Sequence, residues 1–176
     1  SAICMLAYRW AGMTWADAFM HMCTTMGLGG LSSHDASFAY WDSLRIEMVA
    51  TVFMALAGIS FARYFIVWRS RSVGTLVGDA EVRAYVTVLA VAIVVLSVLL
   101  VTHGTYASFP EALRAAAFQT VSLATTTGYS STDYALWPAF APVLLVFLGC
   151  FVSCAGSTGG GIKMVRMIML VKQARR

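Results

Sequence analysis

The chain has 176 residues, of which 60% are hydrophobic and 11% are charged, and its formal net charge is +4. Soluble domains carry about 25% charged residues, so these charges are too few to cover a surface that faces water. A lipid bilayer is the solvent that this composition fits. The modest positive charge does not indicate a nucleic-acid partner.

Basic residues gather in two stretches of the chain. They are Arg63, Arg69, Arg71 and Arg83 in the first stretch, and Lys163, Arg166, Lys172, Arg175 and Arg176 in the second. Positive clusters beside membrane-spanning helices normally mark the cytoplasmic side. We therefore expect the loop 69–83 and the C-terminal tail to be cytoplasmic.

The N-terminal segment predicts a helix end and then a short helix. Ala2–Tyr8 has the composition of a helix whose beginning is missing, and we expect the chain to be a piece of a longer protein. Thr14 and Asp17 have the spacing of an N-terminal cap. They predict a short helix over Ala18–Thr25.

Three longer apolar segments follow. Ile46–Trp68 is expected to span the membrane from outside to inside, with Arg63 near its inner end. Ala84–Thr102 lacks charged residues and is expected to return outward. A third span is expected to start near Pro138 and stays uncharged to Ile162, although its end is rich in glycine.

Between the last two spans lies a helical segment that is too short to cross. Glu111–Ala124 would be roughly 21 Å long at about 1.5 Å per residue. Ser108 is expected to cap it, with proline in the first turn. Because both neighbouring spans have their outer ends here, the segment is expected to enter and leave the membrane on the outer side, as a pore loop does.

The two short helices belong to a repeat. An offset of 98 residues places Gly30-Leu-Ser-Ser-His-Asp35 on Gly128-Tyr-Ser-Ser-Thr-Asp133, with Gly, Ser, Ser and Asp matching. In each copy a capped short helix precedes the match and a span follows it. We therefore predict repeated units of helix, pore loop and helix.

The residues after each short helix have the composition of a cation filter. In such a filter, backbone carbonyl oxygens replace the water around a dehydrated cation. Thr125-Thr-Thr-Gly-Tyr129 is typical of a potassium filter strand, and Met26-Gly-Leu-Gly-Gly30 is a degenerate counterpart. The predicted potassium-binding carbonyls are those of Leu28, Gly29, Gly30, Thr125, Thr126, Thr127 and Gly128.

Three motifs in this order resemble the second and third pore repeats of TrkH-type potassium transporters, in the Trk/Ktr/HKT superfamily. They begin at Gly29, at Thr125 and at Gly156, the last being Gly-Ser-Thr-Gly-Gly-Gly-Ile-Lys163. The resemblance implies four repeats in one polypeptide, of which two would lie outside this chain. It also implies a homodimer and a cytosolic nucleotide-binding regulatory subunit.

The third motif predicts a gate. It lacks the Gly-Lys-Ser/Thr of a phosphate loop, and Ala155 stands where a serine-hydrolase elbow needs glycine. We expect a break in the last helix that forms a loop beneath the filter; a flexible helix end is the alternative. The predicted gate residues are Gly156, Ser157, Thr158, Gly159, Gly160 and Gly161.

We thus predict an all-α, multi-pass inner-membrane protein built of pseudo-symmetric repeats with re-entrant pore helices and extended filter strands. One repeat would cover 1–68, a cytoplasmic loop 69–83, and the next repeat with its basic tail 84–176. The predicted function is potassium uptake, passive or ion-coupled, with no covalent cofactor and no metal other than potassium. The alternatives are a subunit of a tetrameric potassium channel and, from another class, an intramembrane serine protease using Ser157.

Overall fold

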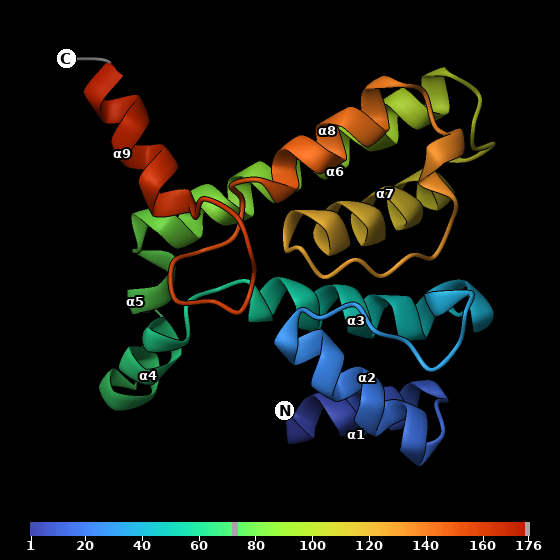
Figure 1. Cartoon of the computed structure of the whole chain (residues 1–176), viewed down its shortest axis with the longest axis horizontal. Coiled ribbons are helices and arrows are strands. Elements are labelled where there is room, and N and C mark those ends of the chain that lie inside the picture. Colours follow the sequence, from blue (N-terminus) through green and yellow to red (C-terminus); the bar gives the residue numbers. More distant parts are fainter. Residues whose placement is uncertain (72–73, 175–176) are drawn as a thin grey trace.

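The computed structural model describes residues 1–71 and 74–174, and every regular element in this part of the chain is a helix. Figure 1 shows two groups of three helices, joined by contacts between α3 and α7. The first group is α1 (Ala2–Ala11), α2 (Trp15–Gly27) and α3 (Leu44–Ala57), and the second is α6 (Ala80–Thr102), α7 (Phe109–Ala124) and α8 (Phe140–Gly149).

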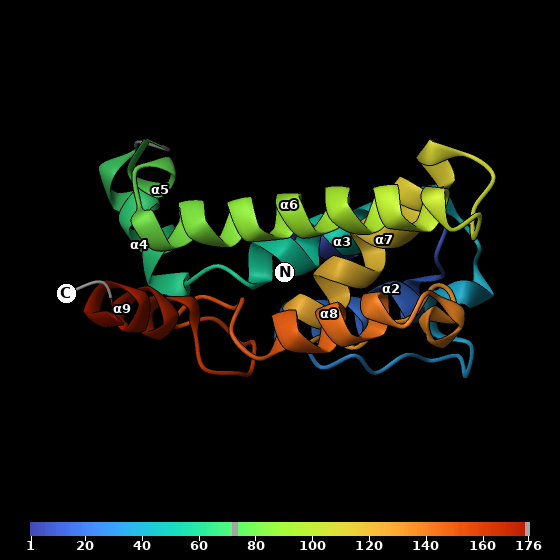
Figure 2. The same ribbon diagram turned by 90° about the horizontal axis from the view of Figure 1, so that it is seen from above.

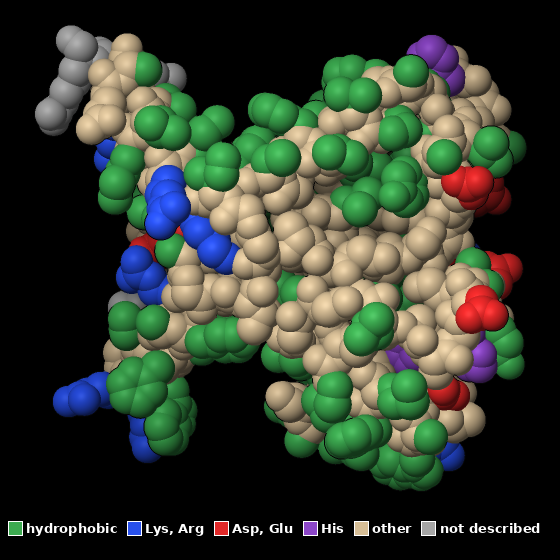
Figure 3. All heavy atoms as spheres, in the orientation of Figure 1, with side chains coloured by type: hydrophobic (Ala, Val, Ile, Leu, Met, Phe, Trp, Pro, Cys, Tyr) green, Lys and Arg blue, Asp and Glu red, His purple; other side chains and the backbone are tan. Residues whose placement is uncertain are grey.

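The remaining helices lie at the two ends of these groups. They are α4 (Phe61–Ser70), α5 (Gly74–Val77) and α9 (Met164–Ala174), with the 3₁₀ turns η1 (Ser37–Tyr40) and η2 (Tyr134–Leu136) at the opposite end. Lys and Arg side chains gather at the end where α4 and α9 lie, and most of the visible Asp and Glu side chains lie at the other end (Figure 3). Arg175 and Arg176 lie outside the described residues.

One helix of the described residues is long and apolar enough to cross a membrane. This is α6, and the predicted span Ala84–Thr102 falls within it. The side chain of Asp79 caps its first turn by accepting hydrogen bonds from the backbone N–H groups of Glu81 and Val82. The helix expectation for this segment is confirmed.

The expected continuous span Ile46–Trp68 is wrong, because the structure divides it into two helices. The axes of α3 and α4 differ by 86°, and only when counted together do the two pass as one span. Backbone from a distant segment enters the break: Gly58 accepts a hydrogen bond from the Cys154 N–H, and the Phe61 N–H donates to the carbonyl of Gly156. These bonds replace the helical ones that a straight helix would make.

The expected third span is also shorter than predicted. Its helix α8 ends at Gly149, well before the glycines on which the predicted break was based. Residues 150–163, called the glycine-rich loop below, form no regular helix and connect α8 to α9. The Ile162 N–H donates a 2.7 Å hydrogen bond to the Cys150 carbonyl, which closes the loop at its base.

The two short helices occupy equivalent places in the two groups. Each is followed by an irregular segment that runs back beside it, the first at residues 28–36 and the second at residues 125–133 (Figure 1). We call these the first and second returning segments. The Thr14 hydroxyl caps α2 by accepting from the Asp17 N–H, as predicted, whereas Ser108 makes no side-chain cap and α7 starts with Pro110 in its first turn.

The helix α7 is the most enclosed element, and it positions the second returning segment. It packs against α3, α6 and α8. Although α6 and α8 overlap in Figure 1, the view in Figure 2 separates them, with α7 beside both. The apolar cores on the two sides of α7 therefore fix the depth and direction at which this short helix ends.

Candidate functional site

The two short helices end in the same hydrogen-bonding pattern, 98 residues apart. At the end of α2, the Gly29 N–H donates to the Thr24 carbonyl over 2.8 Å. At the end of α7, the Thr127 N–H donates to the Ser122 carbonyl over the same 2.8 Å. The repeat found in the sequence is therefore also present in the backbone hydrogen bonds at these positions.

The backbone conformations of the returning segments repeat at the same offset. Leu28 has a φ of 51° and its counterpart Thr126 a φ of 61°, while Gly30 and Gly128 have φ values of 67° and 88°. A positive φ costs a residue with a side chain about 1–2 kcal/mol. Alternating this conformation with ordinary ones lets successive carbonyl groups face one side of the chain, which a regular strand does not allow.

The two returning segments approach each other closely at these residues. A Cβ atom built on Gly30 would lie 2.0 Å from the carbonyl oxygen of Thr127 and 3.4 Å from the carbonyl carbon of Gly128. The Thr127 carbonyl therefore faces the first returning segment. Only glycine fits at position 30, because backbone atoms on the other segment cannot move aside.

The carbonyl oxygens predicted to bind cations have no hydrogen-bond donor within the described part of the chain. This holds for Leu28, Gly29, Gly30, Thr125, Thr126, Thr127 and Gly128. Carbonyls just beyond them are used: those of Tyr129 and Ser130 accept from the Ser122 hydroxyl and the Phe38 N–H. Carbonyls that lack a donor within the protein are left to water or a cation, so the three consecutive ones on the first segment and the four on the second form a set of oxygen ligands available to a cation.

Hydroxyl groups support the second returning segment from behind. The Thr125 and Thr127 hydroxyls lie 2.7 Å apart, and the Thr125 hydroxyl donates to the Val121 carbonyl of α7. Both side chains are buried. These contacts direct the threonine side chains toward α7 and leave the carbonyl edge of the segment uncovered.

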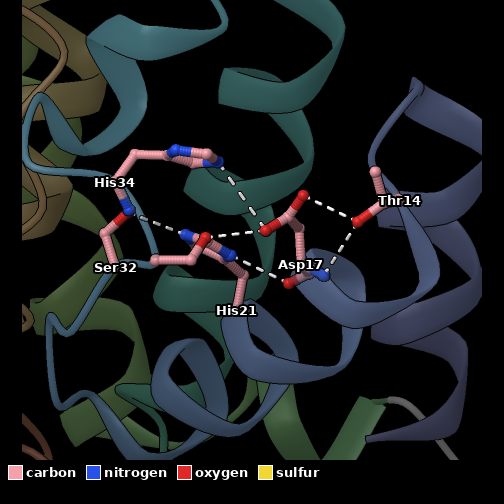
Figure 4. A network of polar contacts seen from close by, with 6 residues as sticks. Thr14, Asp17, His21, Ser32 and His34 are labelled. Atoms are coloured by element: carbon pink, nitrogen blue, oxygen red, sulfur yellow. Dashed lines mark hydrogen bonds and ion pairs between the residues drawn. The ribbon is translucent and has the colours of Figure 1, made fainter.

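A second polar contact holds each returning segment to its own short helix. In the first group, His21 Nε2 lies 3.0 Å from the Ser32 hydroxyl (Figure 4). At the 98-residue offset, the Gln119 side-chain amide donates to the Ser130 hydroxyl over 3.4 Å. His21 is therefore a buried polar contact between α2 and the first returning segment.

Asp17 anchors the outer part of the first returning segment. It accepts hydrogen bonds from the hydroxyls of Thr14 and Ser33, both at 2.7 Å, and His34 lies 3.7 Å from it (Figure 4). The hydrogen bond from Thr14, followed by that from Ser33, lowers the pKa of the Asp17 carboxyl below its usual range. The carboxylate form therefore holds the segment to the first turn of α2.

Tyr129 links the two groups, and sequence reasoning treated it only as part of the filter motif. Its ring is buried, and its hydroxyl contacts the side chains of Thr24 and Thr25 at the end of α2. Tyr8 of α1 shares this cluster through a 2.7 Å hydrogen bond to Thr25. No sequence pattern identifies a partner more than 100 residues away, so these contacts were not predicted.

A buried ion pair also joins the groups, and sequence reasoning missed it. Arg114 of α7 binds both carboxylate oxygens of Glu47 in α3, with N–O distances of 2.7 and 3.0 Å, and reaches Asp42 at 3.1 Å. Glu47 is only 5% exposed. The signal available was the charge itself, since an acidic residue within an apolar span requires a partner.

The predicted gate residues lie in the glycine-rich loop, against both returning segments. The Thr158 hydroxyl donates to the Met26 carbonyl at the end of α2, and the Gly160 N–H donates a 2.7 Å bond to the Thr126 hydroxyl. A Cβ built on Gly159 would lie 3.0 Å from the Thr125 carbonyl oxygen. The loop thus covers the ends of both returning segments that are nearest to the basic end of the molecule.

Three further contacts hold the loop in this place. Glu81 of α6 accepts a 2.7 Å hydrogen bond from the Ala155 N–H, and the Ser153 hydroxyl donates to the Gly160 carbonyl. The Lys163 ammonium reaches back to the Gly159 carbonyl. Ser157 does not have the surroundings of a nucleophile, because its hydroxyl donates to the Cys154 carbonyl within the same loop.

Comparisons with known proteins agree on one family. Residues 3–176 match the family model of TrkH, described as a cation transport protein. The chain is 42% identical over 174 residues to the Trk system potassium uptake protein TrkH of Halomonas elongata, and 34% identical over 176 residues to TrkG of Escherichia coli K12. Each alignment covers 98% of this chain, and 36% and 35% of the respective relatives.

A solved structure has the same fold. The crystal structure of the potassium transporter TrkH from Vibrio parahaemolyticus superposes with a TM-score of 0.94 at 39% sequence identity, covering 99% of this chain and 38% of that one. The present chain therefore spans little more than a third of the length of the relatives that it matches.

Proposed function

The chain belongs to the TrkH family of cation transport proteins, a family of membrane potassium transporters rather than enzymes, and on that premise we propose that its two returning segments are strands of a potassium filter. In this proposal, potassium passes along the unpaired carbonyls of residues 28–30 and 125–128. The complete filter would need the equivalent strands of two further repeats in the same polypeptide.

One observation carries the proposal: adjacent unpaired carbonyls stand on two segments that repeat the same unusual alternation of φ. A dehydrated potassium ion requires several carbonyl oxygens around it at once. In addition, α2 and α7 both end at these segments, and the partial negative charge at the end of each helix favours a cation there. Water or a cation is the only partner left for such carbonyls.

The topology that we propose follows from the charges. Basic side chains gather around α4 and α9, and such clusters normally lie on the cytoplasmic side. Residues 1–68 would form one re-entrant pore repeat, 69–83 a cytoplasmic loop, and 84–176 the next repeat with a cytoplasmic tail. The filter would then open to the outside, and the glycine-rich loop would lie on its inner side.

The filter proposal is tested by rubidium uptake into liposomes that contain the full-length protein. We expect uptake that is inhibited by added potassium and much less by sodium at the same concentration. A protein that incorporates normally but takes up rubidium no faster than empty liposomes, or does not distinguish potassium from sodium, would overturn the proposal.

We also propose that Gly156–Gly161 form a gate within the glycine-rich loop. Its contacts with Met26 and Thr126 are single hydrogen bonds, each worth about 1 kcal/mol. Because, among the described residues, only these two hydrogen bonds join the loop to the end of α2 and to the second returning segment, the loop can occlude the filter in one state and withdraw in another, with a few kcal/mol between the states. Lys163 and α9 follow directly, so a cytosolic partner that moves α9 would shift this balance.

Deletion of residues 156–161 in the full-length protein tests the gate. We expect a changed rate of rubidium uptake and a lost response to the regulatory partner, with the preference for potassium over sodium nearly unchanged. If both the rate and its regulation stay as in the unaltered protein, the loop is only a break between helices. A homodimer and a cytosolic nucleotide-binding regulatory subunit remain proposals that rest on the family resemblance.

A further inference from the structure

A cavity of about 190 Å³ lies between the start of α7, the end of the second returning segment and the start of α3, apart from the carbonyls proposed to bind potassium. Four of its lining residues are charged: Asp42, Glu47, Glu111 and Arg114. Ser131, Thr132 and Tyr106 contribute hydroxyl groups. The cavity is large enough for several water molecules, each of which occupies about 30 Å³ in the liquid.

The charge of this cavity favours a cation. Three carboxylates face one guanidinium, and Arg114 is already bound to both oxygens of Glu47 and to Asp42. Glu111 makes no hydrogen bond or ion pair within the described residues. Its carboxylate is therefore the one without a cationic partner.

Two hydroxyl groups that line the cavity lack partners. The oxygens of Ser131 and Thr132 are buried and make no hydrogen bond in the described part of the chain. Ser131 is 9% exposed. Buried hydroxyls normally have a hydrogen-bond partner, so a ligand or water in the cavity is the partner left for these groups.

The repeat explains why these partners are missing. In the first group, Ser33 stands 98 residues before Ser131, and its hydroxyl donates to Asp17. The residue 98 positions after Asp17 is Ala115, which lines the cavity beside Ser131. The second group has thus lost the carboxylate that pairs with this serine, and it has a cavity at the same place.

We propose that this cavity is a second cation site, which binds a monovalent alkali cation with part of its water shell before the cation enters the filter. Glu111 supplies the charge, and the Ser131 and Thr132 hydroxyls supply oxygen ligands. A divalent ion is disfavoured, because Arg114 already engages Glu47 and Asp42 and leaves Glu111 as the one free carboxylate among the described residues of the cavity. The transport role of the site rests on the proposed filter, whereas cation binding does not.

Stability measurements test binding without any transport. Melting temperatures of the full-length protein in detergent are compared in sodium chloride and in choline chloride at equal ionic strength. Sodium is used because the proposed filter discriminates against it. We expect sodium to raise the melting temperature of the unaltered protein and of the Ser33→Ala control, and not that of Ser131→Ala or Glu111→Gln.

The direction of the stability change in Ser131→Ala distinguishes a cation site from a cavity that binds no cation. If no cation binds, removal of an unpaired buried hydroxyl leaves stability unchanged or raises it in both salts. A Ser131→Ala protein that keeps the full sodium response would overturn the proposal. So would an equal loss of the response in Asp35→Asn, which removes an exposed carboxylate from the first returning segment, away from the cavity.

Rubidium uptake at low ionic strength then tests the transport role. Ser131→Ala and Glu111→Gln should raise the KM by about three- to tenfold, with unchanged maximal rate and unchanged preference over sodium. Asp35→Asn should leave the KM unchanged. Unaltered KM values in both cavity variants would overturn the staging role, whereas absence of uptake by the unaltered protein would count against the filter proposal instead.

Discussion

At the scale of single residues, Gly30 and Gly128 share a positive φ but differ in their surroundings. A side chain on Gly30 would collide with the Thr127 carbonyl, whereas a Cβ on Gly128 would meet no atom within 4 Å. Replacement of Gly128 therefore costs only the backbone term of about 1–2 kcal/mol. Replacement of Gly30 has this backbone cost and would also force the second returning segment to move.

We therefore predict that Gly30→Ala harms folding more than Gly128→Ala. The full-length Gly30→Ala protein should be produced in lower amount and melt at a lower temperature, whereas Gly128→Ala should stay close to the unaltered protein. Expression level and thermal melting in detergent provide the measurement. Equal tolerance of the two variants would mean that the segments do not approach each other in the assembled protein.

A second prediction concerns the ion pair between Arg114 and Glu47. Glu47→Gln leaves the guanidinium with only the exposed Asp42, and breaking a buried pair typically costs about 3–5 kcal/mol. Because the Arg114 side chain is 33% exposed, we expect a loss near the lower end of that range. Asp35→Asn, which removes an exposed carboxylate away from this pair, is the control.

The double variant Glu47→Gln, Arg114→Gln completes this experiment. If the pair joins α3 to α7, the double variant should lose less stability than the sum of the two single variants. Thermal melting of the unaltered protein, the two single variants and the double variant gives the coupling free energy between the two side chains. Additive losses would show that the two charges act independently.

At the scale of elements, the sequence predicted the two short helices but missed what bends the longer helices. Caps and lengths identified α2 and α7, since these signals lie within a few residues of one another. The break after α3 is bridged by hydrogen bonds from the Cys154 N–H to Gly58 and from the Phe61 N–H to Gly156, each between residues that lie far apart in the sequence. Hydropathy does not carry such information. The ion pair and the Tyr129 contact were missed for the same reason.

The glycine-rich loop provides the third prediction. Thr158→Val keeps the side-chain shape and removes the hydrogen bond to the Met26 carbonyl. Loss of about 1 kcal/mol from the occluded state would raise basal rubidium uptake by about fivefold, with no change in selectivity. Ser157→Ala is the matched control, because that hydroxyl bonds only within the loop. Unchanged uptake in Thr158→Val, or an equal rise in Ser157→Ala, would argue against a latch at Met26.

The anchor of the first returning segment provides a prediction on pH. The pKa of Asp17 is lowered in the folded protein, first by the Thr14 hydrogen bond. Its stabilising contribution is thus complete above the unfolded value of about 3.9, and it is lost as pH falls through the lower folded pKa. As the pH is lowered from 5 through the folded pKa of Asp17, the melting temperature of the unaltered protein should fall further than that of Asp17→Asn. Parallel curves would contradict this role.

At the scale of the whole molecule, the proposed filter requires that two segments of different sequence line one ion path. The sequence indicated this through a motif that repeats at an offset of 98 residues. At that offset, the two segments also share their backbone hydrogen bonds and their pattern of φ angles. The polar ends of the molecule also differ, with basic residues around α4 and α9. The remaining walls of the path would come from parts of the polypeptide outside these 176 residues.

The most direct test of the filter is the ion preference of Gly128→Ser in the full-length protein. Because its cost is confined to the backbone, this variant should fold and reach the membrane, and its carbonyls should no longer keep their direction. Uptake of rubidium in competition with sodium, corrected for the amount of protein in the membrane, gives the preference. The account predicts that the preference for potassium-like ions falls far more than expression does. A folded Gly128→Ser protein with unaltered preference would contradict a filter at this segment.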